Sequence, residues 1–68
     1  MQLKIEVERE ADGRWIAEVP ELPGVMAYGK TREEAISAAE ALSFRVLAER
    51  IENGEDIPQV PMLFAVAG

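Results

Sequence analysis

The segment from Arg32 to Glu52 contains neither glycine nor proline, and it is rich in Ala, Glu, Leu and Arg, which favour the α-helix. Thr31, followed three residues later by Glu34, forms a capping box in which the threonine oxygen accepts from the Glu34 N–H and the glutamate reaches back to the Thr31 N–H. Asn53-Gly54 supplies the left-handed residue that commonly closes a helix. The sequence therefore predicts one helix over 32–52, and the remaining residues must provide the surface on which it packs.

The residues before this helix show the alternation of a sheet with one buried face. Apolar and charged side chains alternate in residues 2–9, and 14–19 resumes the strand pattern with Trp15, Ala17 and Val19 on one side. The Ala-Asp-Gly segment at 11–13 between them has turn chemistry. The proline-rich segment 20–24 lacks the backbone donors that a central strand needs, so it is expected to bend before a third strand begins at 25–28. We expect a hairpin followed by a third antiparallel strand.

After the helix, Pro58 and Pro61 favour an extended connection, and Leu63–Val66 is short and continuously apolar, as a final strand in a sheet would be. The predicted fold is α+β with the order β-β-β-α-β, a three-stranded antiparallel sheet plus one long helix and a short final strand. The chain shows no internal repeat and no linker, so residues 1–68 are expected to form one domain.

Composition excludes several classes of function. Seven Lys and Arg against thirteen Asp and Glu give a net charge of −6, which repels the phosphate backbone and argues against nucleic-acid binding by this chain alone. With no cysteine and no histidine, the commonest metal ligands and general bases are missing, and a reducing cytoplasm fits. The longest apolar run, Met62 to Ala67, is far shorter than the roughly 20 residues of a membrane helix.

Few side chains suggest catalysis or metal binding. Asp12, Glu18 and Glu21 lie on or near the predicted hairpin and bend, but exposed positions in turns and strands explain them as solvated surface. Ser37 and Ser43 have no base on the helix that would make them nucleophilic. We therefore predict no catalytic residue, no metal site and no cofactor.

Apolar side chains of the predicted helix fall into two groups on roughly opposite faces. The first is dominated by small residues and is expected to lie on the sheet: Ala35, Ala38, Ala39, Leu42 and Val46. The second is expected to form a self-association or partner surface: Phe44, Leu47, Ala48 and Ile51. Alternatively, the helix is rotated, or the carboxy-terminal segment folds back over Phe44 and Ile51.

Three segments taken together resemble the HicB-like antitoxin domain. They are Asp12–Gly24, which runs from the hairpin into P-x-L-P-G, then Tyr28–Ala35, which opens the helix, and Ile51–Pro58, which follows it. The resemblance covers about residues 3–60 and implies a partial RNase H-like fold that lacks the catalytic carboxylates. It also implies a role in a bacterial toxin–antitoxin system, in which the chain neutralises a small basic HicA-type toxin that cleaves mRNA. The expected form is a short stand-alone member without the carboxy-terminal DNA-binding domain.

Three hypotheses for function follow. In the first, the acidic surface and the second apolar helix group bind a basic toxin. In the second, the chain is an orphan homodimeric scaffold or binding module with no cognate toxin. In the third, it is a vestigial or metal-dependent nuclease, which requires clustered carboxylates that the strand pattern does not supply. The sequence favours the non-catalytic antitoxin.

Overall fold

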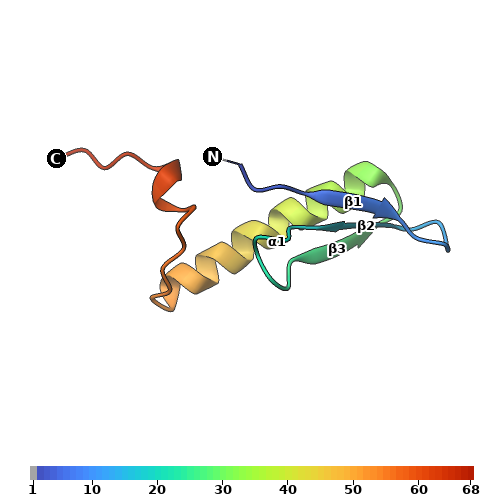
Figure 1. Cartoon of the computed structure of the whole chain (residues 1–68), viewed down its shortest axis with the longest axis horizontal. Helices are drawn as coiled ribbons and strands as arrows, with labels where there is room; N and C mark the ends of the chain where they lie inside the picture. The colour runs from blue at the N-terminus through green and yellow to red at the C-terminus, as the bar shows by residue number, and fades with distance from the viewer. Residues whose placement is uncertain (1) are drawn as a thin grey trace.

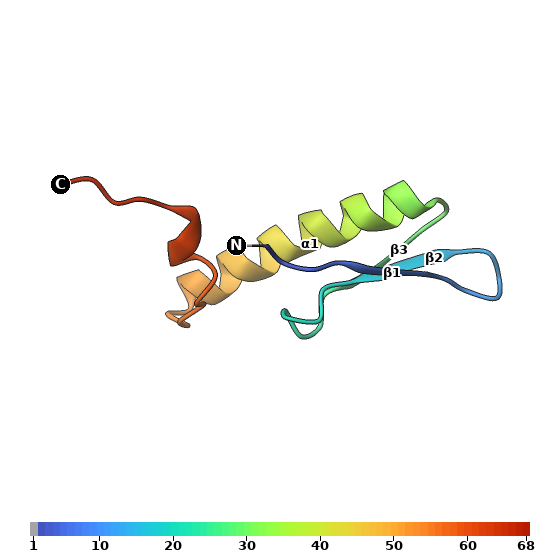
Figure 2. The ribbon, with the colours of Figure 1, turned by 45° about the horizontal axis from the view of Figure 1, so that its top comes forward.

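Three short antiparallel strands and one long helix form the folded core of the structure, a computed structural model that describes residues 2–68 (Figure 1). The elements in chain order are β1 (Glu6–Arg9), β2 (Trp15–Glu18), β3 (Met26–Gly29), α1 (Arg32–Glu52) and the 3-10 turn η1 (Pro61–Leu63). The sheet order is β1-β2-β3, and α1 lies across one of its two faces (Figure 2). This arrangement confirms the predicted α+β class, the hairpin and the helix bounds.

The first strand is shorter than the predicted 2–9 because its partner strand ends early. Glu6 pairs with Glu18, so the same register would place Lys4 opposite Pro20, which has no N–H to donate. The Lys4 N–H donates instead to Glu21 Oε1 at 3.3 Å. Residues 2–5 thus continue the line of β1, with their alternating exposure, but without backbone pairing.

The bend between β2 and β3 is anchored in the core. The Val19 N–H donates to the Val25 carbonyl at 3.1 Å, which closes the base of the bend, and Leu22 at its tip is 2% exposed. Arg50 near the end of α1 donates to the Pro23 carbonyl at 3.1 Å. The bend therefore joins the sheet to the carboxy-terminal half of the helix, a role that its prolines alone did not indicate.

The helix begins and ends as its flanking residues predict, with one difference at the start. Thr31 Oγ1 accepts from the Glu34 N–H at 3.1 Å, as expected for the cap. The Glu34 carboxylate, however, accepts from the Lys30 N–H at 2.9 Å, and so reaches one residue further back than the predicted capping box. Gly54 has a φ of +79° and donates to the Ile51 carbonyl, which confirms it as the left-handed closing residue.

Two small clusters form the core. Near the start of α1, small side chains allow the helix to lie close to the sheet, with half-buried Val7 and Trp15 at their edge. Towards its end, larger side chains fill the space between the helix and the bend. The buried members of the first cluster are Ala17, Ala35 and Ala39, and those of the second are Val19, Leu22, Val25 and Leu47.

The helix face that packs on the core includes most of the predicted first group and extends beyond it, because Ala35 and Ala39 are buried and Leu42 and Val46 pack against the second cluster. The buried residues lie four apart along a single row, Ala35, Ala39, Ser43 and Leu47. Because each step of four residues turns by about 40°, this row moves around the helix, and at its end it reaches Leu47. Leu47 is 6% exposed, so its assignment to the free apolar group was wrong.

Within residues 2–68, no helix is long and apolar enough to cross a membrane.

The predicted final strand is absent from the described residues. Residues 61–63 form η1 instead, and the tail that follows has extended backbone at Phe64 but no strand partner. A proline at the first position favours this turn. An apolar run becomes a strand only where a free sheet edge accepts it, and this tail leads away from the sheet (Figures 1 and 2). The β-β-β-α part of the predicted order is confirmed, and the last β is wrong for the single chain.

Candidate binding surfaces

The sheet has one face that no helix or strand of residues 2–68 covers (Figure 2). Side chains alternate along each strand, so the register determines which of them share this face. Glu6 lies opposite Glu18, which lies opposite Met26, and Glu8 lies opposite Ile16, which lies opposite Tyr28. We call this surface the acidic sheet face: Glu6, Glu8, Ile16, Glu18, Met26 and Tyr28.

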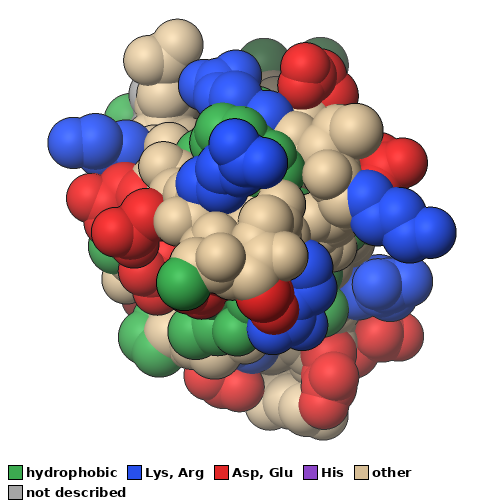
Figure 3. Space-filling view, turned by 90° about the vertical axis from the view of Figure 1, so that its right-hand side faces the viewer, with side chains coloured by type: hydrophobic (Ala, Val, Ile, Leu, Met, Phe, Trp, Pro, Cys, Tyr) green, Lys and Arg blue, Asp and Glu red, His purple; other side chains and the backbone are tan. Residues whose placement is uncertain are grey.

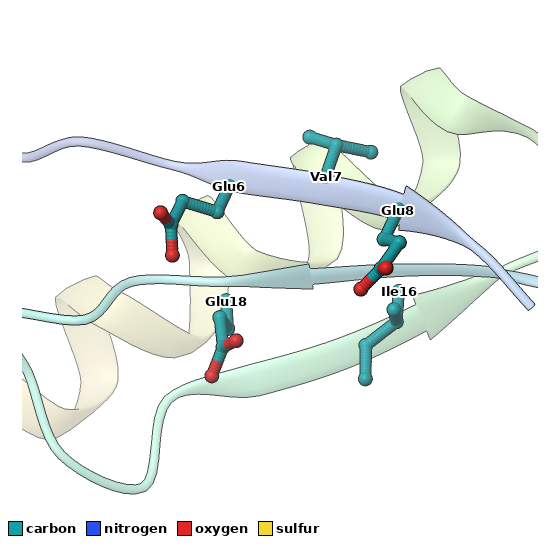
Figure 4. A pocket seen from close by; sticks show the side chains of 5 residues that line it. All are labelled: Glu6, Val7, Glu8, Ile16 and Glu18. Carbon is teal, nitrogen blue, oxygen red and sulfur yellow. The ribbon is translucent and has the colours of Figure 1, made fainter.

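Three carboxylates gather on the β1–β2 side of the acidic sheet face. Figure 4 shows Glu6, Glu8 and Glu18 on the same side of the two strands, whereas Val7 points the opposite way. Together with Ile16 they line a shallow hollow of about 230 Å³. Glu6 and Glu18 are directly opposite each other, an arrangement of like charges that destabilises a strand pair. This face therefore carries negative charge at a cost to the fold.

The β3 side of the same face is apolar. Met26 and Tyr28 are each about half exposed, at 48% and 47%. The Arg14 guanidinium lies over the Tyr28 ring, 4.5 Å from its centroid, which shows that a cation is accommodated here. Carboxylates beside exposed aromatic and aliphatic side chains suit a partner that presents arginine or lysine, because the charged ends of such residues pair with carboxylates while their stems pack on apolar surface.

The β1–β2 turn has its own internal charge pairing. Asp12 accepts from the Arg14 backbone N–H at 3.0 Å and from its guanidinium Nε at 2.7 Å. The backbone hydrogen bond, followed by the guanidinium, lowers the pKa of the Asp12 carboxyl. Figure 3, which looks at the right-hand end of Figure 1, shows basic and acidic side chains intermixed. This end of the molecule therefore does not present a field of one sign.

The carboxylates that were considered as metal ligands do not form one site. Asp12 is engaged by Arg14 in the turn, Glu18 lies on the acidic sheet face, and Glu21 accepts from the Lys4 N–H beside the bend. Across residues 2–68, no group of three or more potential ligands is placed to hold a metal ion. Ser43, one of the two helix serines, is buried and donates to the Ala39 carbonyl at 2.7 Å.

A second surface lies between α1 and the line of β1. An apolar groove of about 240 Å³ runs there, with the sides provided by the helix, by residues 2–5 and by η1. Among the described residues that line it, Glu40 is the only charged one. We call this surface the helix groove: Leu3, Ile5, Glu40, Ser43, Phe44, Leu47 and Leu63.

The predicted partner surface overlaps this groove only in part. Phe44 is 70% exposed and Ile51 is 47% exposed, and Ala48 is also exposed, so these three side chains are accessible as expected. Leu47 instead forms the floor of the groove and belongs to the core. The alternation of apolar and charged residues in 5–8, together with Glu18, could have revealed the acidic sheet face, but only once the register between the strands was known.

Comparison of the chain with protein-family models, with curated proteins and with solved structures finds no match.

Proposed function

We propose that this chain is a non-catalytic binding protein of the HicB-like antitoxin type, which neutralises a small basic HicA-type toxin that cleaves mRNA. The observation that carries the proposal is the position of Glu6, Glu8 and Glu18 together on the uncovered sheet face. Surface charges that destabilise a sheet are useful where a partner of opposite charge neutralises them. The resemblance of the sequence to HicB-like domains supports the same partner.

Neutralisation rests on a competition between the carboxylates of this chain and the phosphates of RNA for the lysine and arginine side chains of the toxin. An RNA-cleaving protein holds the phosphate backbone with lysine and arginine side chains. The acidic sheet face offers carboxylates to those same groups, and Met26 and Tyr28 add apolar contact beside them. The net charge of −6 steers the encounter between the two proteins. The bound antitoxin would then keep RNA away from the toxin by occupying its basic surface.

Charge reversal on the acidic sheet face tests this proposal. A panel of HicA-type toxins is co-expressed with the chain and scored for growth, and binding to an inactive toxin variant is measured by calorimetry. The double variant Glu6→Lys and Glu18→Lys should abolish rescue and raise Kd by about tenfold or more for each reversal. The control, Glu49→Lys with Glu52→Lys, makes the same change of net charge on the exposed end of α1 and should retain rescue.

Rescue by the double variant on the sheet face, or failure of the unaltered chain to bind every toxin of the panel, would contradict the proposal. In the second case the alternative gains support, namely an orphan homodimeric scaffold with no cognate toxin. One observation favours that alternative: the helix groove and the exposed apolar tail beside it are unpartnered in the single chain. A stable dimer that binds no toxin would establish it.

A further inference from the structure

The single chain exposes more surface than a compact protein of the same mass. Its accessible surface is 5102 Å², whereas a compact monomer of 7.5 kDa exposes about 4,250 Å². The radius of gyration is 13.9 Å, compared with about 11 Å for a compact domain of 68 residues. The excess of about 850 Å² is close to the ~800 Å² that each partner contributes to a standard protein interface.

Much of the exposed apolar surface lies in the carboxy-terminal tail. Met62, Phe64 and Val66 are 66%, 71% and 95% exposed. In an extended chain these three side chains share one face, because successive side chains alternate, and Phe64 already has the dihedral angles of a strand at φ −129° and ψ 142°. The tail therefore has the composition of a strand and, at Phe64, its dihedral angles, and the turn η1 has to open for Met62 to join such a strand.

The molecule also has an unoccupied place for such a strand. Within residues 2–68, β1 pairs with β2 alone, so its other edge presents free backbone donors and acceptors. The helix groove lies along this same edge, with Leu3 and Ile5 from the line of β1 on one side and Phe44 from α1 on the other. A strand added at this edge would gain main-chain hydrogen bonds and would cover the groove with its alternate side chains.

The same chain covers only the rim of this place, through Leu63. Ile57 and Val60 pack against the second core cluster and fix the connection at the end of α1. Leu63 then reaches the rim of the groove, and the residues after it lead away from the strands in both views (Figures 1 and 2). A tail that leaves the molecule beside its own groove is positioned to enter the groove of a second copy of the chain.

We propose that two copies of this chain exchange their tails, each adding residues 62–66 as a fourth strand to the free edge of β1 in the other copy and covering its helix groove. The exchange is reciprocal, as a two-fold symmetric dimer requires. It accounts for the final strand that the sequence predicts, which is absent in the single chain and is completed by the second copy. It does not depend on the identity of any toxin, because it involves this chain alone.

Sedimentation of the pure chain at micromolar concentration tests the exchange. We expect a dimer, twice the 7.5 kDa monomer mass. Phe64→Glu should raise the dimer Kd about tenfold or more, with unchanged circular dichroism because Phe64 is outside the core. Met26→Glu, a substitution of a half-exposed side chain on the opposite face of the sheet, should leave the dimer intact. A monomeric chain, or a dimer that is indifferent to Phe64→Glu, would overturn the proposal.

Cysteine pairing distinguishes exchange from a tail that folds back on its own chain. The sequence has no cysteine, so Phe44→Cys and Phe64→Cys can be made in separate chains, mixed and oxidised. Exchange predicts a disulfide between the two different chains, seen as a dimer on a non-reducing gel. A second variant carries both Phe44→Cys and Phe64→Cys in one chain. If its disulfide formed only within that chain, exchange would be contradicted and the groove would be assigned to the chain's own tail.

Discussion

Replacing Gly29 with alanine should weaken the fold strongly, because β3 ends directly against the start of the helix. A Cβ at this position would lie 2.8 Å from both the Glu34 carbonyl carbon and Glu34 Cβ, and closer still to the Ala35 nitrogen. Those atoms include helix backbone, so relief requires the start of α1 to move away from the sheet and to loosen Ala35 from its cluster with Ala17. We expect a cost of about 3 kcal/mol, out of the roughly 3–10 kcal/mol that stabilises a domain of this length.

Thermal and urea unfolding measure this cost directly. The expected loss corresponds to a fall in Tm of about 12–24 °C for a domain of this size. Gly54→Ala is the control, because Gly54 has a φ of +79° and open space around it, so alanine there tests backbone strain without a clash and should cost only about 1 kcal/mol. If the free energy of unfolding of Gly29→Ala lay within about 0.5 kcal/mol of that of the unaltered chain, the close approach of helix and strand would be refuted.

Three further predictions concern the helix and the hairpin turn. Ala39→Leu should cost about 1–3 kcal/mol by overpacking, whereas Ala41→Leu on the exposed face should stay within about 0.5 kcal/mol, both measured by urea unfolding. Thr31→Ala should cost about 1 kcal/mol through loss of the helix cap, and a Tm unchanged from that of the unaltered chain would contradict this. The folded-state pKa of Asp12 is lowered, so its stabilising effect is complete above the pKa of the unfolded chain and is lost as pH falls through the folded value. Arg14→Gln removes the guanidinium but keeps the backbone N–H, so NMR titration should find this pKa partly raised, and no change would disprove the guanidinium's contribution.

Local signals explain why much of the fold was predictable. The cap at Thr31, the glycine at 54 and the absence of helix breakers between them are properties of neighbouring residues, and they determined the helix bounds. The alternation of apolar and charged residues likewise determined the hairpin, and Gly13 at φ +92° confirms the turn between its strands. Each of these features depends on residues that are close together in the sequence.

The parts that were not predictable depend on contacts between distant residues. Helical periodicity assigns Leu47 to the second apolar group of the helix. In the structure, the oblique path of α1 across the sheet brings Leu47 to Val19 and Leu22 in the core. The start of β1 at Glu6 depends on Pro20, which is opposite Lys4 only in the observed register. The final strand required a free edge within reach, and no local pattern reveals whether that edge is in the same chain.

The two binding surfaces differ in chemistry and therefore in the partners they suit. The acidic sheet face combines three carboxylates with exposed Tyr28 and Met26, which suits arginine and lysine side chains. The helix groove is apolar along a free strand edge, which suits an apolar strand. Because the surfaces lie on different sides of the sheet, a dimer formed through the groove would leave both acidic sheet faces open to partners.

We propose that this chain acts by offering its acidic sheet face to a basic protein. Amide chemical-shift mapping tests it most directly, with the isotope-labelled chain titrated with an inactive HicA-type toxin. We expect the largest shifts on β1, β2 and β3 around Glu6, Glu8 and Glu18, and we expect them to disappear in 1 M salt, where exposed charges are screened within about 3 Å. Shifts confined to the groove side of α1, or binding that salt does not weaken, would contradict it.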